Sequence, residues 1–132
     1  MQSLTLKRDQ LQRMIEHVDL HAPAEACGLL AGKDTRVEKV IVVQNRAQDP
    51  ARYRMDPIEQ LSAFKWIDTQ ALELSGIFHS HPCGPAIVSP TDIRESAYAV
   101  VQVILARGPG GWQARGFWIE TDGFHEVQLQ IE

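Results

Sequence analysis

The chain has 132 residues, of which 44% are hydrophobic and 23% charged, and a formal net charge of −4. These values predict one soluble domain over residues 1–132, and the acidic balance argues against a nucleic-acid partner. No apolar run is long enough to span a membrane, and no signal-peptide pattern is present at the N-terminus, so we expect a cytoplasmic protein.

The first half of the chain predicts a helix followed by two strands. Apolar residues spaced i, i+3, i+4 and i+7 predict an amphipathic helix over residues 8–21, which Pro23 ends. The residues with this spacing are Leu11, Met14, Ile15 and Val18. Apolar runs then predict buried strands over residues 28–32 and 36–43, and a polar loop over residues 44–54.

A second helix follows the polar loop. Its first turn has the sequence expected of a helix start, with Asp56 as the N-cap, Pro57 at N1 and Glu59 at N3. We expect this helix to run to about Leu74, because residues 75–76 are Ser-Gly and break the pattern.

Strands dominate the second half of the chain. Residues 77–81 predict a strand that Pro82 ends, and residues 89–92 open a third helix. A further buried strand follows, and a glycine-rich turn at residues 108–111 separates it from an antiparallel pair of strands. These three strands are predicted over residues 100–106, 112–120 and 124–131. The fold class is therefore mixed α/β.

Two histidines at the end of the 77–81 strand indicate a metal site. His79 and His81 are two residues apart, so on a strand their side chains point to the same face. Asp92, one loop later, can fold back as a third ligand. Two nitrogens and one carboxylate oxygen, with a fourth position for water, form a catalytic zinc site. The pair alone leaves open that both histidines are ordinary surface residues.

Asp92 has a second interpretation. Ser89 and Asp92 also form the pattern of a capping box, in which Asp92 at N3 points back to the backbone of Ser89. Asp56 and Glu59 show the same pattern without nearby histidines. A metal ligand aims its oxygen at the metal, whereas a capping residue aims it at the N-cap amide, so the two roles compete.

Hydrolysis at a zinc site also needs a general base, and Glu25, just before the 28–32 strand, is a candidate. By position alone, a solvated glutamate is the simpler interpretation. Cys83 lies two residues beyond His81 and is an alternative sulfur ligand, although Pro82 interrupts the strand alternation. Cys27 lies in an apolar segment and is expected to be a core residue.

Taken together, these residues resemble the JAMM (MPN-plus) metalloproteases. The pattern of that family is an upstream glutamate, then His-Ser/Thr-His-Pro, then a serine that is separated from the second histidine by seven residues, and an aspartate three beyond that serine. Glu25, the His79–Pro82 segment, Ser89 and Asp92 match it in full. The resemblance implies one zinc ion per chain, held by His79, His81 and Asp92.

The resemblance also implies roles, a fold and a substrate class. Glu25 would be the general base, and Ser89 would hold the substrate carbonyl or the oxyanion. The fold would be that of MPN and cytidine-deaminase-like domains, a curved mixed sheet flanked by helices. The substrates would be ubiquitin-like or sulfur-carrier proteins with a C-terminal Gly-Gly, cut at an isopeptide or peptide bond after the tail. Release of cysteine or another amino acid from such a carrier is the alternative.

Three other functions compete with this one. A non-catalytic MPN scaffold would lack the metal residues, and none is missing here. A nucleoside deaminase needs H-x-E and P-C-x-x-C, whereas residues 81 and 86 are His and Ala. A small-molecule amidase using the same centre stays open, and the pattern does not predict an oligomeric state.

Overall fold

The computed structural model describes residues 3–132, and Met1 and Gln2, which the predicted domain includes, lie outside the described residues. Three helices and seven strands are described within that range. In chain order they are β1 (Ser3–Leu6), α1 (Arg8–His21), β2 (Cys27–Lys33), β3 (Arg36–Val43), α2 (Pro57–Thr69), β4 (Glu73–His81), α3 (Pro90–Glu95), β5 (Val101–Gly108), β6 (Gly111–Glu120) and β7 (Gly123–Ile131).

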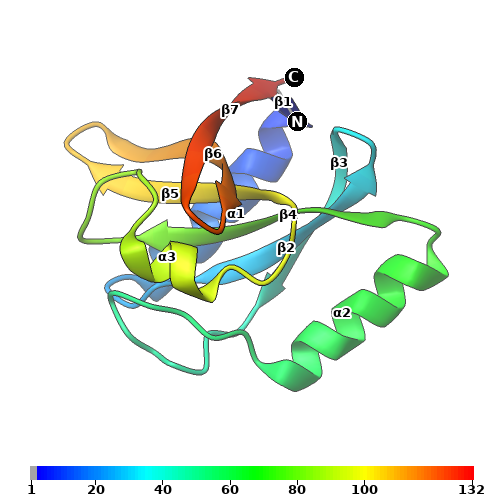
Figure 1. Ribbon diagram of the computed structural model, residues 1–132, viewed down its shortest axis with the longest axis horizontal. Coiled ribbons are helices and arrows are strands. Elements are labelled where there is room, and N and C mark those ends of the chain that lie inside the picture. Colours follow the sequence, from blue (N-terminus) through cyan, green and yellow to red (C-terminus); the bar gives the residue numbers. More distant parts are fainter. Residues whose placement is uncertain (1–2) are drawn as a thin grey trace.

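The strands form one mixed sheet that curves until it closes into a barrel, in the order β1-β3-β2-β4-β5-β6-β7. Strand β1 pairs in parallel with both β3 and β7 and so joins the two edges of the sheet. The two ends of the chain lie side by side at the top of Figure 1, where the Glu132 amide donates to the Leu6 carbonyl at 2.8 Å. The closing contact is short, because β1 and β3 pair only where Thr5 lies opposite Arg36.

Most of the predicted elements are confirmed. Helix α1 has the predicted bounds, but Gln10 is buried with Met14 and Val18 on its inner face, and its amide donates to the Val37 carbonyl at 3.1 Å. Strand β1 was not predicted, because four residues alternating polar and apolar give little periodic signal. The sequence suggested a curved sheet, whereas the observed sheet closes into a barrel. None of the helices in residues 3–132 combines the length and apolar content that a membrane crossing requires.

The predicted end of α2 is wrong by about five residues. The helix ends at Thr69, and Leu72 and Ala71 donate backbone hydrogen bonds to the carbonyls of Ile67 and Asp68. These two bonds form a Schellman motif, whose C′ residue must adopt the left-handed conformation. Ala71, with a φ of 56°, takes the place that glycine usually holds. The usual glycine signal is therefore absent here, and the Ser-Gly pair at 75–76 lies inside β4 instead.

Strands β2 and β4 position the site, and they pair antiparallel with Cys27 opposite His79. The two strands lie against each other where Gly28 faces Phe78. A β-carbon at position 28 would lie 2.3 Å from Cε1 of Phe78 and 2.6 Å from the carbonyl oxygen of Ile41. Only glycine therefore fits at this position without moving the strand that carries both histidines.

Gly28→Ala should accordingly lower the free energy of unfolding by about 1–3 kcal/mol, because overpacking a closed core forces strained side chains. Urea denaturation followed by circular dichroism measures the effect. Gly110→Ala is the matched control, since nothing lies within 4 Å of a β-carbon there. Equal midpoints for the two variants would contradict the packing argument.

Candidate metal centre

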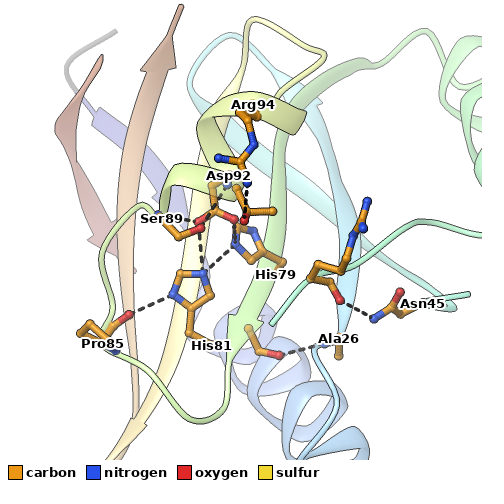
Figure 2. A network of polar contacts seen from close by, with 11 residues as sticks. Ala26, Asn45, His79, His81, Pro85, Ser89, Asp92 and Arg94 are labelled. Atoms are coloured by element: carbon orange, nitrogen blue, oxygen red, sulfur yellow. Dashed lines mark hydrogen bonds and ion pairs between the residues drawn. The ribbon is translucent and has the colours of Figure 1, made fainter. Parts of the chain in front are cut away.

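Three side chains from two elements converge on one point. His79 and His81 come from the end of β4, and Asp92 comes from α3. The Nε2 atom of His79 lies 3.1 Å from Oδ1 of Asp92, and the Nε2 atom of His81 lies 3.1 Å from Oδ2. The two Nε2 atoms are themselves 3.1 Å apart. Figure 2 shows the three side chains pointing toward one another.

This spacing fits a metal ion. Tetrahedral zinc with bonds of about 2.0–2.1 Å places its ligand atoms about 3.3 Å apart. The ligand atoms of His79, His81 and Asp92 all lie within 4.8 Å of one another, and they form the metal-holding group found among residues 3–132. Two facing imidazole nitrogens beside one carboxylate are a donor set that a divalent cation would satisfy. The predicted set of three residues is thus brought together.

The backbone fixes the orientation of His81. Its Nδ1 atom lies 2.9 Å from the carbonyl oxygen of Pro85 and can only donate to it. In the neutral ring this leaves the Nε2 lone pair directed at the metal point, an arrangement that orients metal-ligating histidines. The Pro82–Val88 loop therefore has a function in the site besides connecting β4 to α3.

The electrostatics of the cluster favour a neutral His79 and an ionised Asp92. Burial lowers the pKa of His79, which outweighs its hydrogen bond to Asp92. Burial alone would raise the pKa of Asp92, but hydrogen bonds from His79, from His81 and from the Ser89 amide hold that pKa far below its usual range. His81 donates to Asp92 through Nε2 only when its ring is protonated; burial lowers the pKa of His81, but its hydrogen bonds to Asp92 and to the Pro85 carbonyl together outweigh burial and raise it. A metal ion would displace this proton. A lone pair on imidazole and a charge on the carboxylate are the states that bind a metal ion.

The competition between capping and ligation does not arise. Asp92 Oδ2 accepts the Ser89 backbone N–H at 2.9 Å while it also lies 3.1 Å from His81. Ser89 completes the capping box by accepting the Asp92 N–H on Oγ at 3.1 Å. The cap therefore holds the carboxylate in position for the metal point. In α2 the corresponding Glu59 instead accepts the Gln44 amide, at 2.9 Å, so the two helix starts differ.

Glu25 is a buried acid without a partner. Its side chain is 3% exposed, and Oε1 has no hydrogen-bond partner among the described residues. It shares a hollow of about 400 Å³ with His81 and Ser89. Burial raises the pKa of Glu25 to about 8, and the nearby His81 opposes this rise. A carboxylate with a raised pKa beside a metal point is suited to proton transfer.

Sequence reasoning missed the residues that hold Glu25 and His79 in place. Ser80, between the two histidines, accepts the Ala26 amide on Oγ at 2.8 Å and joins the backbone before β2 to β4. Asn45 donates to the Glu25 carbonyl at 2.8 Å, and Tyr53 stacks on the His79 ring with centroids 4.8 Å apart. The serine in His-Ser-His was a usable signal for the first of these contacts, whereas nothing in the sequence indicated the other two.

The two cysteines lie in different environments. Cys27 is buried, as predicted, with Sγ 3.6 Å from the Val43 carbonyl oxygen, and burial raises the pKa of its thiol to about 12. Cys83 is exposed, and it does not belong to the metal-holding group. The alternative that Cys83 is a third ligand is therefore wrong, because Pro82 and the turn after it carry the chain away from the face of β4.

Residues 7–119 match the family described as prokaryotic homologs of the JAB domain. The chain belongs to this family. The matched range includes Glu25 and the three residues of the metal centre. The predicted resemblance to the JAMM (MPN-plus) proteins is therefore confirmed.

Similar proteins match most of the chain. A desampylase from Pyrococcus furiosus is 35% identical over 91% of this chain and 85% of its own length. A probable TtuB-protein conjugate cleaving protease from Thermus thermophilus is 40% identical over 77% of this chain and 69% of its own length. A CysO-cysteine peptidase from Mycobacterium tuberculosis is 33% identical over 97% and 90%.

Solved structures show the same JAB-domain fold. A protein from Desulfitobacterium hafniense superposes with a TM-score of 0.88 at 34% identity, over 98% of this chain and 92% of that chain. A JAB1/MPN domain protein from Archaeoglobus fulgidus gives a TM-score of 0.63 at 18% identity, over 98% of each chain. The predicted mixed α/β fold of the MPN type is thus confirmed.

Proposed function

We propose that this JAB-domain protein is a zinc-dependent hydrolase that cleaves the amide bond after the C-terminal Gly-Gly of ubiquitin-like or sulfur-carrier proteins. The observation that carries the proposal is the convergence of His79, His81 and Asp92 beside the unpartnered acid Glu25. The names of the three relatives, each a protease, peptidase or desampylase, support the reaction class.

Zinc is the metal that suits this site best. Two imidazole nitrogens and one carboxylate oxygen leave one tetrahedral position open, which is the arrangement of catalytic rather than structural zinc. Magnesium and calcium prefer sites made of oxygen ligands alone. We therefore assign one zinc ion per chain to His79, His81 and Asp92. A bound zinc ion would supply Lewis acidity that polarises the scissile carbonyl and makes water a stronger acid.

The protein's own groups move the proton and hold the carbonyl. Glu25 takes a proton from the attacking water and returns it to the nitrogen of the leaving amine. The Ser89 hydroxyl accepts the Asp92 N–H, so its own proton is available to donate to the oxygen of the scissile carbonyl. That bond strengthens as negative charge develops on the oxygen.

A Gly-Gly tail suits the crowded surroundings of the metal point on the side of His79. A hollow of only about 20 Å³ lies there, lined among others by Tyr53, His79, Asp92 and Gln102. Glycine has no side chain and can lie extended against a backbone where other residues would collide. The partner is therefore a carrier protein with a glycine tail, and neither nucleic acid nor membrane is required. We also propose that residues 1–132 form a single domain and that the protein is cytoplasmic.

Release of cysteine or another amino acid from a carrier is the second candidate, favoured by the CysO-cysteine peptidase relative. A non-catalytic scaffold fits the complete metal cluster poorly. A deaminase would need Cys83 as a ligand, and Cys83 is not in the metal-holding group. A small-molecule amidase using the same centre stays open, and cleavage of a carrier with a glycine tail distinguishes it from the proposed function.

Mass spectrometry of a ubiquitin-like carrier with a short extension after Gly-Gly tests the proposal. We expect cleavage immediately after the second glycine, loss of cleavage on incubation with a zinc chelator, and recovery when zinc is restored. Metal analysis of the untreated protein should give about one zinc ion per chain. Chelator-insensitive cleavage, or zinc binding without cleavage of any glycine tail, would count against the proposed function.

A further inference from the structure

The loop between β3 and α2 holds the backbone of Glu25, which lies just before β2. The Glu25 N–H donates to the Asp49 carbonyl at 2.8 Å, and the Glu25 carbonyl accepts the side-chain amide of Asn45, also at 2.8 Å. Oε1 of the Glu25 carboxylate, by contrast, has no hydrogen-bond partner among the described residues. No bond to that oxygen aims the acid, so its direction depends on where the loop holds the main chain.

The peptide group that joins Glu25 to Ala26 is held at both of its polar atoms. Asn45 donates to its carbonyl oxygen, and its N–H donates to Oγ of Ser80 at 2.8 Å. Open space lies nearby, because Glu25 lines the hollow of about 400 Å³ and also a hollow of about 570 Å³ between α1 and residues 44–50. Without the bond from Asn45, this peptide group could turn about its contact with Ser80 and carry the carboxylate with it.

The side chain of Asn45 is buried and fully used. Its Nδ2 also donates to the Arg52 carbonyl at 3.3 Å, and its Oδ1 accepts the N–H groups of Ala47 at 2.9 Å and Arg54 at 2.8 Å. One side chain thus satisfies four main-chain groups, which requires both the donors and the acceptor of a primary amide. Aspartate has the same length but lacks the donors. The sequence contains no other asparagine.

The same loop also reaches the surroundings of the metal point. Tyr53 stacks on the ring of His79 with centroids 4.8 Å apart, and Arg52 is paired with Glu95 on α3 at 3.0 Å. A change in the loop could therefore reach the reaction by two routes, through the base or through a metal ligand. The direct bond from Asn45 goes to Glu25, whereas its connection to His79 passes through the backbone of the loop.

From these contacts we infer that Asn45 is a positioning residue for the general base, and that turnover depends on it while zinc binding does not. Asn45 touches neither the substrate nor the metal point. It fixes the carbonyl of Glu25 while Ser80 fixes the following N–H, and the two bonds together orient the carboxylate. The inference rests on the proposed function, in which Glu25 moves the proton.

Asn45→Ser tests this role without adding a charge beside Glu25. The serine hydroxyl can still accept the Ala47 N–H in a turn of the same kind, but it is too short to reach the Glu25 carbonyl. Because proton transfer depends steeply on geometry, kcat on a Gly-Gly conjugate should fall about 10–100-fold, with KM and zinc affinity within about twofold of the wild type. A zinc affinity that fell in parallel with kcat would place the effect at the metal ligands and overturn the inference.

Gln10→Ser is the matched control. Gln10 and Asn45 are both 8% exposed. The Gln10 amide likewise joins two main-chain groups, because it accepts the Lys7 N–H at 2.8 Å and donates to the Val37 carbonyl at 3.1 Å. It lines neither hollow that Glu25 borders. This variant should lose stability but keep the kcat of the wild type, and an equal loss of kcat in both variants would show that Asn45 acts only through stability.

The double variant Asn45→Ser/Glu25→Gln shows whether Asn45 acts through Glu25. A residue that only positions the base has nothing left to position once the base is removed, so kcat of the double variant should equal that of Glu25→Gln. A further loss of about 10–100-fold, as in the wild-type background, would overturn the inference.

Isotope labelling of asparagine gives a readout that needs neither zinc nor turnover. With one asparagine in the chain, nuclear magnetic resonance detects a single side-chain amide of that residue type. Its two protons should exchange with solvent more slowly than those of an exposed amide, because both are donated to buried carbonyls. Fast exchange would contradict the inference and leave the proposed function intact. Absence of cleavage by the zinc-loaded wild type would contradict the proposed function, and the inference with it.

Discussion

Glu25→Gln is expected to retain about one zinc ion per chain while turnover of a Gly-Gly conjugate falls by about 10²–10⁴-fold. The substitution keeps the size and the hydrogen-bonding capacity of the side chain but removes the ability to accept a proton. Glu25 does not belong to the metal-holding group, so the metal affinity should change little. Steady-state kinetics and metal analysis on the same preparation measure both effects.

Glu16→Gln is the matched control for this variant. Glu16 lies exposed on α1, and its only side-chain contact in the described residues is a hydrogen bond from Gln12. The Glu16→Gln variant should keep full activity, because its change from carboxylate to amide is remote from the reacting atoms. Full activity in Glu25→Gln would show that another group accepts the proton, and the assignment of the general base would then be wrong.

The metal-free protein offers an independent check on Glu25. Burial raises its pKa from an ordinary value of 4.5 to about 8, so the folded chain holds a proton that the unfolded chain releases between these values. Stability should therefore fall as pH rises from about 4.5 to about 8. Glu25→Gln lacks this titration, so it should exceed the wild type by roughly 1–3 kcal/mol above about pH 8 and match it below about pH 4.

The site was more predictable from the sequence than the fold around it. The two histidines lie two residues apart on a strand, and a proline ends that strand, so their common face and their place at the strand end follow from local rules. Asp92 and Glu25 were candidates from their positions alone, and the family pattern supported both and added Ser89. In the structure His79, His81 and Asp92 form one group, and Glu25 and Ser89 line the hollow that also contains His81. The short spacing between His79, His81 and Asp92 was therefore enough to predict the ligand set.

Long-range contacts account for what the sequence did not reveal. Strand β1 is stabilised by pairing with β3 and β7, which are distant in the chain, and its own four residues give little periodicity. The end of α2 depends on Ala71 in a conformation that glycine usually adopts. Asn45 and Tyr53 act through contacts with Glu25 and His79 that only the folded chain creates. Each of these features depends on tertiary structure rather than on local pattern.

The second large effect is expected from Asp92→Asn. An asparagine oxygen can still accept the Ser89 N–H, so the start of α3 should persist, but the negative charge that faces His79 and His81 is lost. We expect the zinc affinity to fall by about 100-fold or more, with a parallel loss of turnover. The metal-free protein should lose some stability as well, because the ionised carboxylate interacts with both imidazoles, but it should remain folded. Competition with a chromophoric chelator measures the affinity, and thermal unfolding of the metal-free protein measures the stability.

Glu59→Gln separates ligation from the general effect of changing an acid at the start of a helix. Glu59 holds the same N3 position in α2, where it accepts the Gln44 amide, and it does not belong to the metal-holding group. This variant should bind zinc as the wild type does. If Asp92→Asn instead weakened folding while zinc affinity stayed unchanged, the carboxylate would be a cap and not a ligand. Because one oxygen of Asp92 contacts both the Ser89 amide and His81, the two measurements must be made on the same variant to tell these roles apart.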